Sequence, residues 1–95
     1  MRLELSRRAQ ADLDDIRDFS VRQYGIDRAI LYLDAIEQGF RRLLDHPRIG
    51  SDRDDLRPGL RSYPVGEHRV YYRLTTDCVA VVRVLHKSMD EARNL

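Results

Sequence analysis

The sequence predicts an α+β fold: an N-terminal strand, followed by an antiparallel helical hairpin that packs on a small antiparallel β-sheet. Two observations lead to this prediction. Apolar residues recur at helical spacing in the first half of the chain, whereas short runs rich in Val, Tyr and Leu fill the second half. The chain has 95 residues, which suffice for one hydrophobic core but not for two. We therefore expect a single domain over residues 1–95, with its elements in the order β-α-α-β-β-β.

The first elements are a short strand and an amphipathic helix. Leu3 and Leu5 alternate with charged residues, which predicts a half-buried strand. Ser6 is a good N-cap for the helix that follows, because its side-chain oxygen can accept a hydrogen bond from the first turn. Apolar positions then recur at helical spacing up to Tyr24, and Gly25 is expected to end the helix.

A second amphipathic helix follows after a link of two residues. Asp27 is its predicted N-cap. The apolar positions of this helix repeat at intervals of three and four, at Ile30, Leu33, Ile36, Phe40, Leu43 and Leu44. Pro47 prevents continuation past His46, because proline lacks the backbone N–H that a helix needs. The short link predicts that the two helices form an antiparallel hairpin.

The second half of the chain is predicted to contain a loop and three antiparallel strands. Residues 47–59 combine proline, glycine and charged residues, which is typical of a loop. Residues 60–65, 68–74 and 79–86 have strand composition and are separated by connections short enough for hairpins. The remaining tail, residues 87–95, is polar and has room for one helical turn.

The middle strand has two faces of different character. Arg69, Tyr71 and Arg73 share one face, and the apolar residues that alternate with them share the other. We expect the helices to cover the apolar face, so that the basic and aromatic face remains exposed.

Several classes of protein are excluded by composition. The single cysteine, Cys78, cannot form an internal disulfide, and no Cys/His cluster has zinc spacing. No segment approaches the roughly 18 apolar residues of a membrane span, and the N-terminus lacks an apolar signal region. Glycine-rich phosphate loops and nucleophile motifs are also absent. We therefore expect a cytoplasmic protein without metal, cofactor or membrane association.

Basic residues are concentrated in the second half of the chain. The net charge is +1, yet residues 57–87 contain six basic and two acidic residues, a net charge of +4. Most of these bases are arginines, whose planar guanidinium suits carboxylate or phosphate recognition. Ordinary surface charge is the alternative interpretation.

A candidate site lies on the three predicted strands, formed by Arg61, Arg69, Arg73 and Arg83 with His68, Tyr71 and His86. On one face these residues would hold phosphates, with Tyr71 as a stacking platform. Cleavage of RNA would further need a cation, an acid and a base. Arg69, Arg83 and His86 are candidates for the first two roles, and Asp54 or Asp55 for the third. Alternatively, Arg69 and Arg73 pair with carboxylates of the chain, and His86 caps the last strand.

The order and spacing of several segments resemble ParE toxins of the RelE/ParE toxin–antitoxin superfamily. The resemblance begins with residues 5–16 and continues through residues 24–27, 46–50, 56–61, 66–73 and 83–90. The last of these reads RVLHKSMD and is the most specific. Together they span essentially the whole chain, and the superfamily fold is the one that periodicity predicts.

The resemblance implies a function that composition cannot show. ParE-like toxins inhibit DNA gyrase, block replication without being enzymes, and are neutralised by a ParD-like antitoxin. Contact with DNA is then expected only through the antitoxin complex. The residues expected to bind the target or the antitoxin are Arg61, Arg69, Tyr71, Arg73, Arg83, His86, Lys87 and Met89.

The alternative function is that of the RelE-like relatives, which are ribosome-dependent mRNA endonucleases. In that case Arg61, Arg69, Arg83 and His86 would be catalytic. The sequence departs from the RelE-like pattern, because Lys87 is the only lysine and neither the last strand nor the tail contains a tyrosine.

Overall fold

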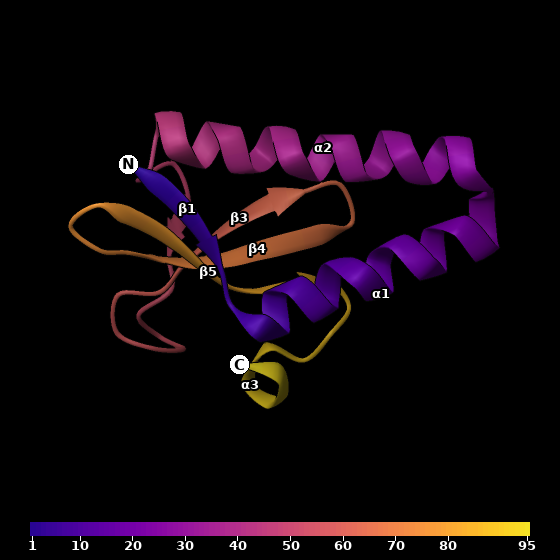
Figure 1. The fold of residues 1–95 in the computed structure, drawn as a ribbon. Coiled ribbons are helices and arrows are strands. Elements are labelled where there is room, and N and C mark those ends of the chain that lie inside the picture. Colours follow the sequence, from indigo (N-terminus) through magenta and orange to yellow (C-terminus); the bar gives the residue numbers. More distant parts are fainter.

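The predicted helical hairpin and strands form in the computed structural model, which describes residues 1–95 (Figure 1). In chain order the elements are β1 (Arg2–Leu5), α1 (Arg7–Tyr24), α2 (Ile26–Asp45), β2 (Ser51–Asp52), β3 (Arg61–Val65), β4 (His68–Leu74), β5 (Cys78–His86) and α3 (Glu91–Asn94). The α+β fold class is thus confirmed. Neither long helix has a stretch apolar enough to cross a membrane.

The ends of the two long helices follow from local chemistry. The Ser6 side chain accepts a hydrogen bond from the Ala9 amide at 2.9 Å, as an N-cap does. Gly25 alone links α1 to α2, and its φ of 87° lies in the region that favours glycine. The prediction of Asp27 as the N-cap of α2 was wrong, since Gly25 holds that position and Asp27 lies in the first turn. A single left-handed glycine reverses the chain with no room for a second linker residue.

The sheet has five strands in the order β1-β5-β4-β3-β2. Its pairs are antiparallel from β2 to β5, but β1 runs parallel to β5, with Arg2 opposite Cys78 and Leu5 opposite Val81. A parallel pair needs a crossover connection, and the helical hairpin lies within the long segment between β1 and β5. The predicted loop also contributes β2, which adds an outer strand beside β3.

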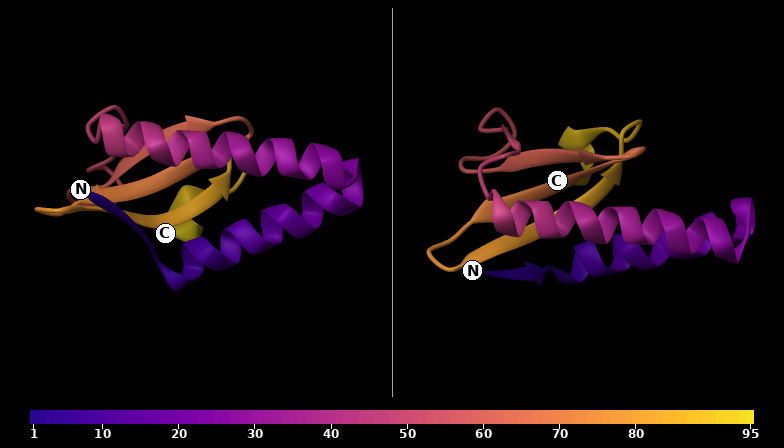
Figure 2. Two further views of the ribbon diagram at one scale, coloured as in Figure 1. Left: turned by 45° about the horizontal axis from the view of Figure 1, so that its top comes forward. Right: turned by 90° about the horizontal axis from the view of Figure 1, so that it is seen from above.

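The helical hairpin covers one face of the sheet, called the helix face, and its tip projects beyond the strands (Figures 1 and 2). Ten buried residues form the core between them: Ala9, Ile16, Ile36, Leu43, Val65, Val70, Tyr72, Val79, Val81 and Val84. They come from both helices and from β3, β4 and β5, so the hairpin and the sheet depend on one another for burial.

The opposite face, called the distal face, carries a smaller cluster. Leu60, Tyr71 and Leu85 are buried there, and Leu56 and Leu95 pack against them. The expectation that this face stays exposed was therefore wrong at its centre. The C-terminal segment crosses it, on the side away from the hairpin (Figure 2).

Candidate functional site

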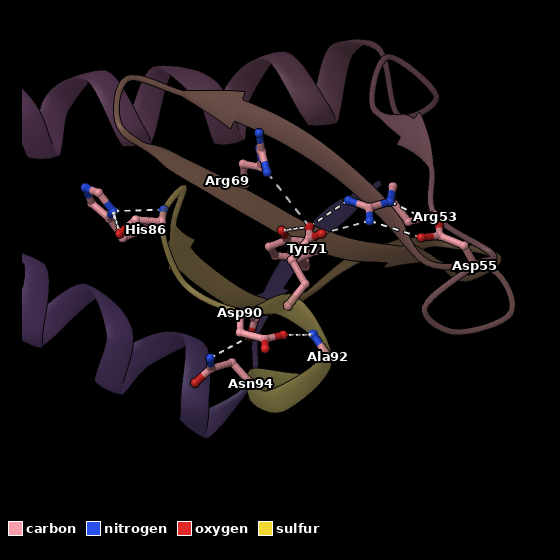
Figure 3. A network of polar contacts seen from close by, with 10 residues as sticks. Arg53, Asp55, Arg69, Tyr71, His86, Asp90, Ala92 and Asn94 are labelled. Atoms are coloured by element: carbon pink, nitrogen blue, oxygen red, sulfur yellow. Dashed lines mark hydrogen bonds and ion pairs between the residues drawn. The ribbon is translucent and has the colours of Figure 1, made fainter.

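The predicted basic cluster is divided between the two faces of the sheet. Arg61 lies opposite Tyr72, and His86 opposite His68, so both lie on the helix face. Arg69 and Arg73 lie on the distal face. Arg83 is opposite Tyr71 in the register, but its guanidinium turns to Asp12 of α1. Figure 3 shows His86 well apart from Arg69. The predicted residues therefore do not all lie together, although Arg69, Tyr71 and Arg73 share the distal face.

Tyr71 is not a stacking platform. Its side chain is buried, with 1% relative exposure, and its hydroxyl donates a hydrogen bond to the Glu91 carboxylate. Burial raises the pKa of Tyr71, and the neighbouring carboxylate raises it further. No aromatic surface is therefore left for a base to stack on at this position.

Arg83 is committed to the fold rather than to a ligand. Its Nε and Nη2 donate to the two carboxylate oxygens of Asp12 in α1, both at 2.8 Å. The Val84 amide donates to the same carboxylate at 2.9 Å. Hydrogen bonding to Asp12 raises the pKa of Arg83, and the two side chains are only 10% and 13% exposed. This bidentate ion pair between Arg83 and Asp12 connects β5 to α1.

The aspartates considered as a base also have structural partners. Asp54 accepts the Gly59 amide at 2.7 Å and so shapes the loop before β3. Asp55 accepts two hydrogen bonds from Arg53, each at 3.1 Å. The bond to Arg53 lowers the pKa of Asp55, which favours the ionised form.

The best-developed polar network lies on the distal face around Glu91. Arg53 Nη1 and Nη2 donate to its two carboxylate oxygens at 2.6 and 2.9 Å, and Tyr71 is a further donor. Arg69 Nη1 lies 4.0 Å from the same carboxylate. Figure 3 shows Arg53 and Arg69 directed at one point beside Tyr71. These interactions, Arg53 foremost, lower the pKa of Glu91 to about 2.

The remaining predicted residues lie at the surface. Lys87 forms an exposed ion pair with Glu67, with Nζ 2.6 Å from Oε2. Arg61 donates to the Gly50 carbonyl at 2.8 Å, beside β2. Arg73 is exposed and makes no ion pair, and Met89 is exposed as well. No three His, Cys, Asp or Glu residues are grouped as a metal site would require.

A groove separates the hairpin from the ends of β4 and β5 on the helix face. One cavity of about 400 Å³ is lined by Phe19 and Leu31 of the hairpin, and by His68 and His86 of the sheet. A second cavity of about 380 Å³ shares Phe19 and both histidines with the first and extends toward Met89. Together they form the helix-face groove.

The two histidines in this groove, His68 and His86, are in direct contact. Their rings meet edge to face with centroids 5.2 Å apart, and the Tyr32 hydroxyl lies 2.5 Å from His68 Nδ1. Burial and the neighbouring His86 lower the pKa of His68, so that its imidazole is mostly neutral at neutral pH. His86 Nδ1 lies 2.7 Å from the Ser88 hydroxyl at the end of β5.

Apolar side chains gather around the tip of the hairpin. The exposed ones are Phe19, Val21, Tyr24, Ile26, Ile30 and Leu31, and Leu31 reaches 68% exposure. Exposed apolar side chains in such number are typical of an interaction surface. Residue patterns alone gave no prediction of this surface. The signal was present in Ile26 and Leu31, which are apolar but lie outside the repeating stripe of the second helix.

The functional class follows from comparison with solved structures. A chain from the structure "Chromosomal ParDE TA system from P. aeruginosa" is 25% identical and superposes with a TM-score of 0.79, covering 90% of this chain and 95% of the other. A chain of the toxin–antitoxin complex RelBE2 from Mycobacterium tuberculosis has a TM-score of 0.62 at 25% identity, covering 90% and 96%. The fold is that of the RelE/ParE toxins.

Sequence comparison narrows the class to a family. The family model described as "ParE toxin of type II toxin-antitoxin system, parDE" matches residues 3–91. Toxin ParE1 of Mycobacterium tuberculosis is 42% identical over 96% of this chain and 94% of its own, and Toxin ParE1 of Caulobacter vibrioides is 38% identical over the same shares. The chain belongs to the ParE toxin family of type II toxin–antitoxin systems.

Proposed function

We propose that this toxin inhibits DNA gyrase by binding it, without catalysis, and that a ParD-like antitoxin neutralises it. The observation that carries the proposal is membership of the ParE family over residues 3–91. The cytoplasm is the proposed location, where gyrase is found, and DNA is contacted only through the antitoxin complex.

The distribution of cations supports binding over mRNA cleavage. Acid–base chemistry at one phosphate requires the base, the cation and the acid within reach of the same atoms. Arg61 and His86 lie on the helix face, whereas Arg69 lies on the distal face. Arg83 is also held by Asp12. This separation disfavours the RelE-like alternative.

Two surfaces remain for two partners. The helix-face groove, with exposed Phe19 and Leu31 on its hairpin side, suits the apolar face of an amphipathic antitoxin helix. Both structural neighbours come from toxin–antitoxin systems, which supports an antitoxin as the partner. For the target, the exposed Arg73 and Lys87 are the predicted contacts that lie outside the groove.

Induction of the toxin in cells tests the proposed target. Growth arrest is expected with a DNA-damage response and altered plasmid supercoiling, and co-expression of a ParD-like antitoxin is expected to relieve it. Primer extension on cellular mRNA tests the alternative function, ribosome-dependent mRNA cleavage. Codon-specific cuts that appear within minutes of induction, with unchanged supercoiling, would contradict gyrase inhibition and favour ribosome-dependent cleavage.

Substitution in the groove tests the antitoxin surface separately. Leu31→Asp is expected to weaken antitoxin binding by at least about tenfold, because it places a charge within an apolar interface. Ile49→Asp is the matched control, since Ile49 is also exposed but lies outside the groove. Equal affinities of the two variants in titration calorimetry would remove the groove from the interface.

A further inference from the structure

The C-terminal strap, residues 87–95, closes the distal face through one carboxylate. The Glu91 carboxylate accepts hydrogen bonds from both terminal nitrogens of Arg53 and from the hydroxyl of Tyr71. Arg69 Nη1 lies 4.0 Å from the same carboxylate. We propose that Arg53, Arg69 and Tyr71 form a binding site for an acidic side chain of a partner protein, and that Glu91 occupies it as an intramolecular ligand in the free chain.

The geometry of the site matches a carboxylate. Arg53 presents its planar fork to both oxygens of the acid at 2.6 and 2.9 Å, the arrangement by which arginine recognises a carboxylate. Asp55 binds the other edge of the same guanidinium and so fixes its orientation. Arg53 is itself only 21% exposed, which shields the interaction from solvent.

The floor of the site favours a peptide over a nucleic acid. Leu60, Tyr71 and Leu85 form a buried apolar cluster on the distal face, and Leu95 of the strap covers it. An acidic peptide with a neighbouring apolar residue reproduces both contacts, the carboxylate on Arg53 and the apolar side chain on this cluster. A phosphodiester chain would supply the charge but not the apolar contact.

Apart from Glu91, the strap is held at its two ends. Its helix, α3, is a single turn, too short to be stable by itself. At its start, the Lys87 amide donates to the Glu67 carbonyl at 2.9 Å and the Lys87 ammonium pairs with the Glu67 side chain. At its end, Leu95 packs on the apolar cluster and Arg83 Nη1 donates to the Asn94 carbonyl at 2.5 Å. The strap does not pair with any strand. A competing acid therefore has little backbone structure to displace.

The charges of Arg53 and Arg69 explain why the site holds Glu91 in the free chain. Release of Glu91 leaves Arg53 and Arg69 beside an apolar cluster without their shared counter-charge, which is unfavourable for partly buried cations. Another anion of the same shape restores the pairing. The strap is thus an exchangeable ligand, and this inference does not depend on gyrase being the target.

Fluorescence anisotropy on the full chain tests the site, with a fluorescein-labelled peptide in which six glutamates alternate with leucines and so supply both the charge and the apolar side chain. Glu91→Ala is expected to bind the peptide at least tenfold more tightly than the unaltered chain, because the internal ligand is removed. Glu37→Ala, which breaks an exposed helical ion pair, is the matched control and is expected to leave binding unchanged. Adding Arg53→Ala to Glu91→Ala is expected to abolish the gain.

Three outcomes would overturn the proposal: a Glu91→Ala affinity equal to that of Glu37→Ala, a gain that survives Arg53→Ala, or an equal gain for a single-stranded oligothymidylate of the same charge. Circular dichroism checks the fold of each variant. If Glu91→Ala is misfolded, Glu91→Gln replaces it, since it keeps the shape of the side chain and removes the charge. A Glu91→Gln affinity equal to that of the unaltered chain would also overturn the proposal.

Discussion

Tyr71 and Tyr72 are adjacent in β4, yet their hydroxyls fasten different segments to opposite faces of the sheet. On the helix face, Tyr72 donates to the Pro47 carbonyl at 2.7 Å and accepts the Gly50 amide at 2.9 Å. On the distal face, Tyr71 donates to Glu91 of the strap. The first tyrosine belongs to a core of ten buried residues, the second to a cluster of three. The attachment at Tyr72 is permanent because it is buried in the apolar core. The attachment at Tyr71 is exchangeable because it depends on the charge of Glu91.

The largest effect is expected in the core of the helix face. Leu43→Ala removes a side chain with no exposure and leaves a cavity between α2 and the sheet, which is expected to cost about 4 kcal/mol of unfolding free energy. Urea unfolding followed by circular dichroism measures it. A loss below about 1 kcal/mol would mean that the hairpin does not depend on this core.

A somewhat smaller effect is expected where α1 meets β5. Asp12→Ala leaves the nearly buried guanidinium of Arg83 without its carboxylate, and we expect a loss of about 3 kcal/mol. The same urea titration applies, with Asp14→Ala as the control on an exposed face of α1. If both variants lose the same stability, the Asp12 pair has no special role.

The adjacent tyrosines test the comparison directly. Tyr72→Phe leaves a buried amide and carbonyl without their shared partner, so it is expected to cost about 2 kcal/mol, whereas Tyr71→Phe is expected to cost about 1 kcal/mol. Amide hydrogen exchange distinguishes the two variants further. Tyr71→Phe is expected to increase exchange only in the strap, and faster exchange throughout the sheet would contradict the distinction.

Glu91→Gln is expected to cost about 1 kcal/mol at neutral pH, no more than Tyr71→Phe, and this effect depends on pH. The folded-state pKa of Glu91 is about 2, below the unfolded value of about 4.3, so the ionised carboxylate stabilises the fold. That contribution is fully present above about pH 4.3 and is lost as the pH falls toward about 2.

This loss is measured by following the amide resonances of the strap by nuclear magnetic resonance from pH 6 to pH 2. Steps on the order of one pH unit cover the range between the unfolded and folded pKa values of Glu91. The unaltered chain is expected to release the strap as Glu91 protonates. Glu91→Gln is expected to show no such transition. An identical titration of both proteins would contradict the role of Glu91 as the anchor.

Local patterns were sufficient to predict most elements of the fold. The Ser6 cap and Gly25 bounded α1 correctly because both signals act within one turn of the chain. The alternation in β4 placed Tyr71 and Tyr72 on opposite faces, as observed. The parallel pairing of β1 could not be predicted, because its partner lies at the other end of the chain and alternation identifies a strand without its neighbour.

The candidate site was predicted less well, for a physical reason. Asp12 and Arg83 are 71 positions apart, and Arg53 and Glu91 are 38 apart. With 17 basic and 16 acidic residues, composition offers many possible pairings, and only the folded chain selects among them. The arginine positions were visible in the sequence, but their partners were not. The contact between His68 and His86 was more accessible to prediction, since a short turn after Leu74 joins β4 directly to β5, its antiparallel neighbour.

A supercoiling assay with purified gyrase and purified toxin tests the central claim most directly. The account predicts that supercoiling falls in proportion to added toxin and returns when the antitoxin is added, with mRNA in a parallel translation reaction left intact. Full supercoiling activity in excess toxin, from a preparation that arrests growth in cells, would contradict the claim.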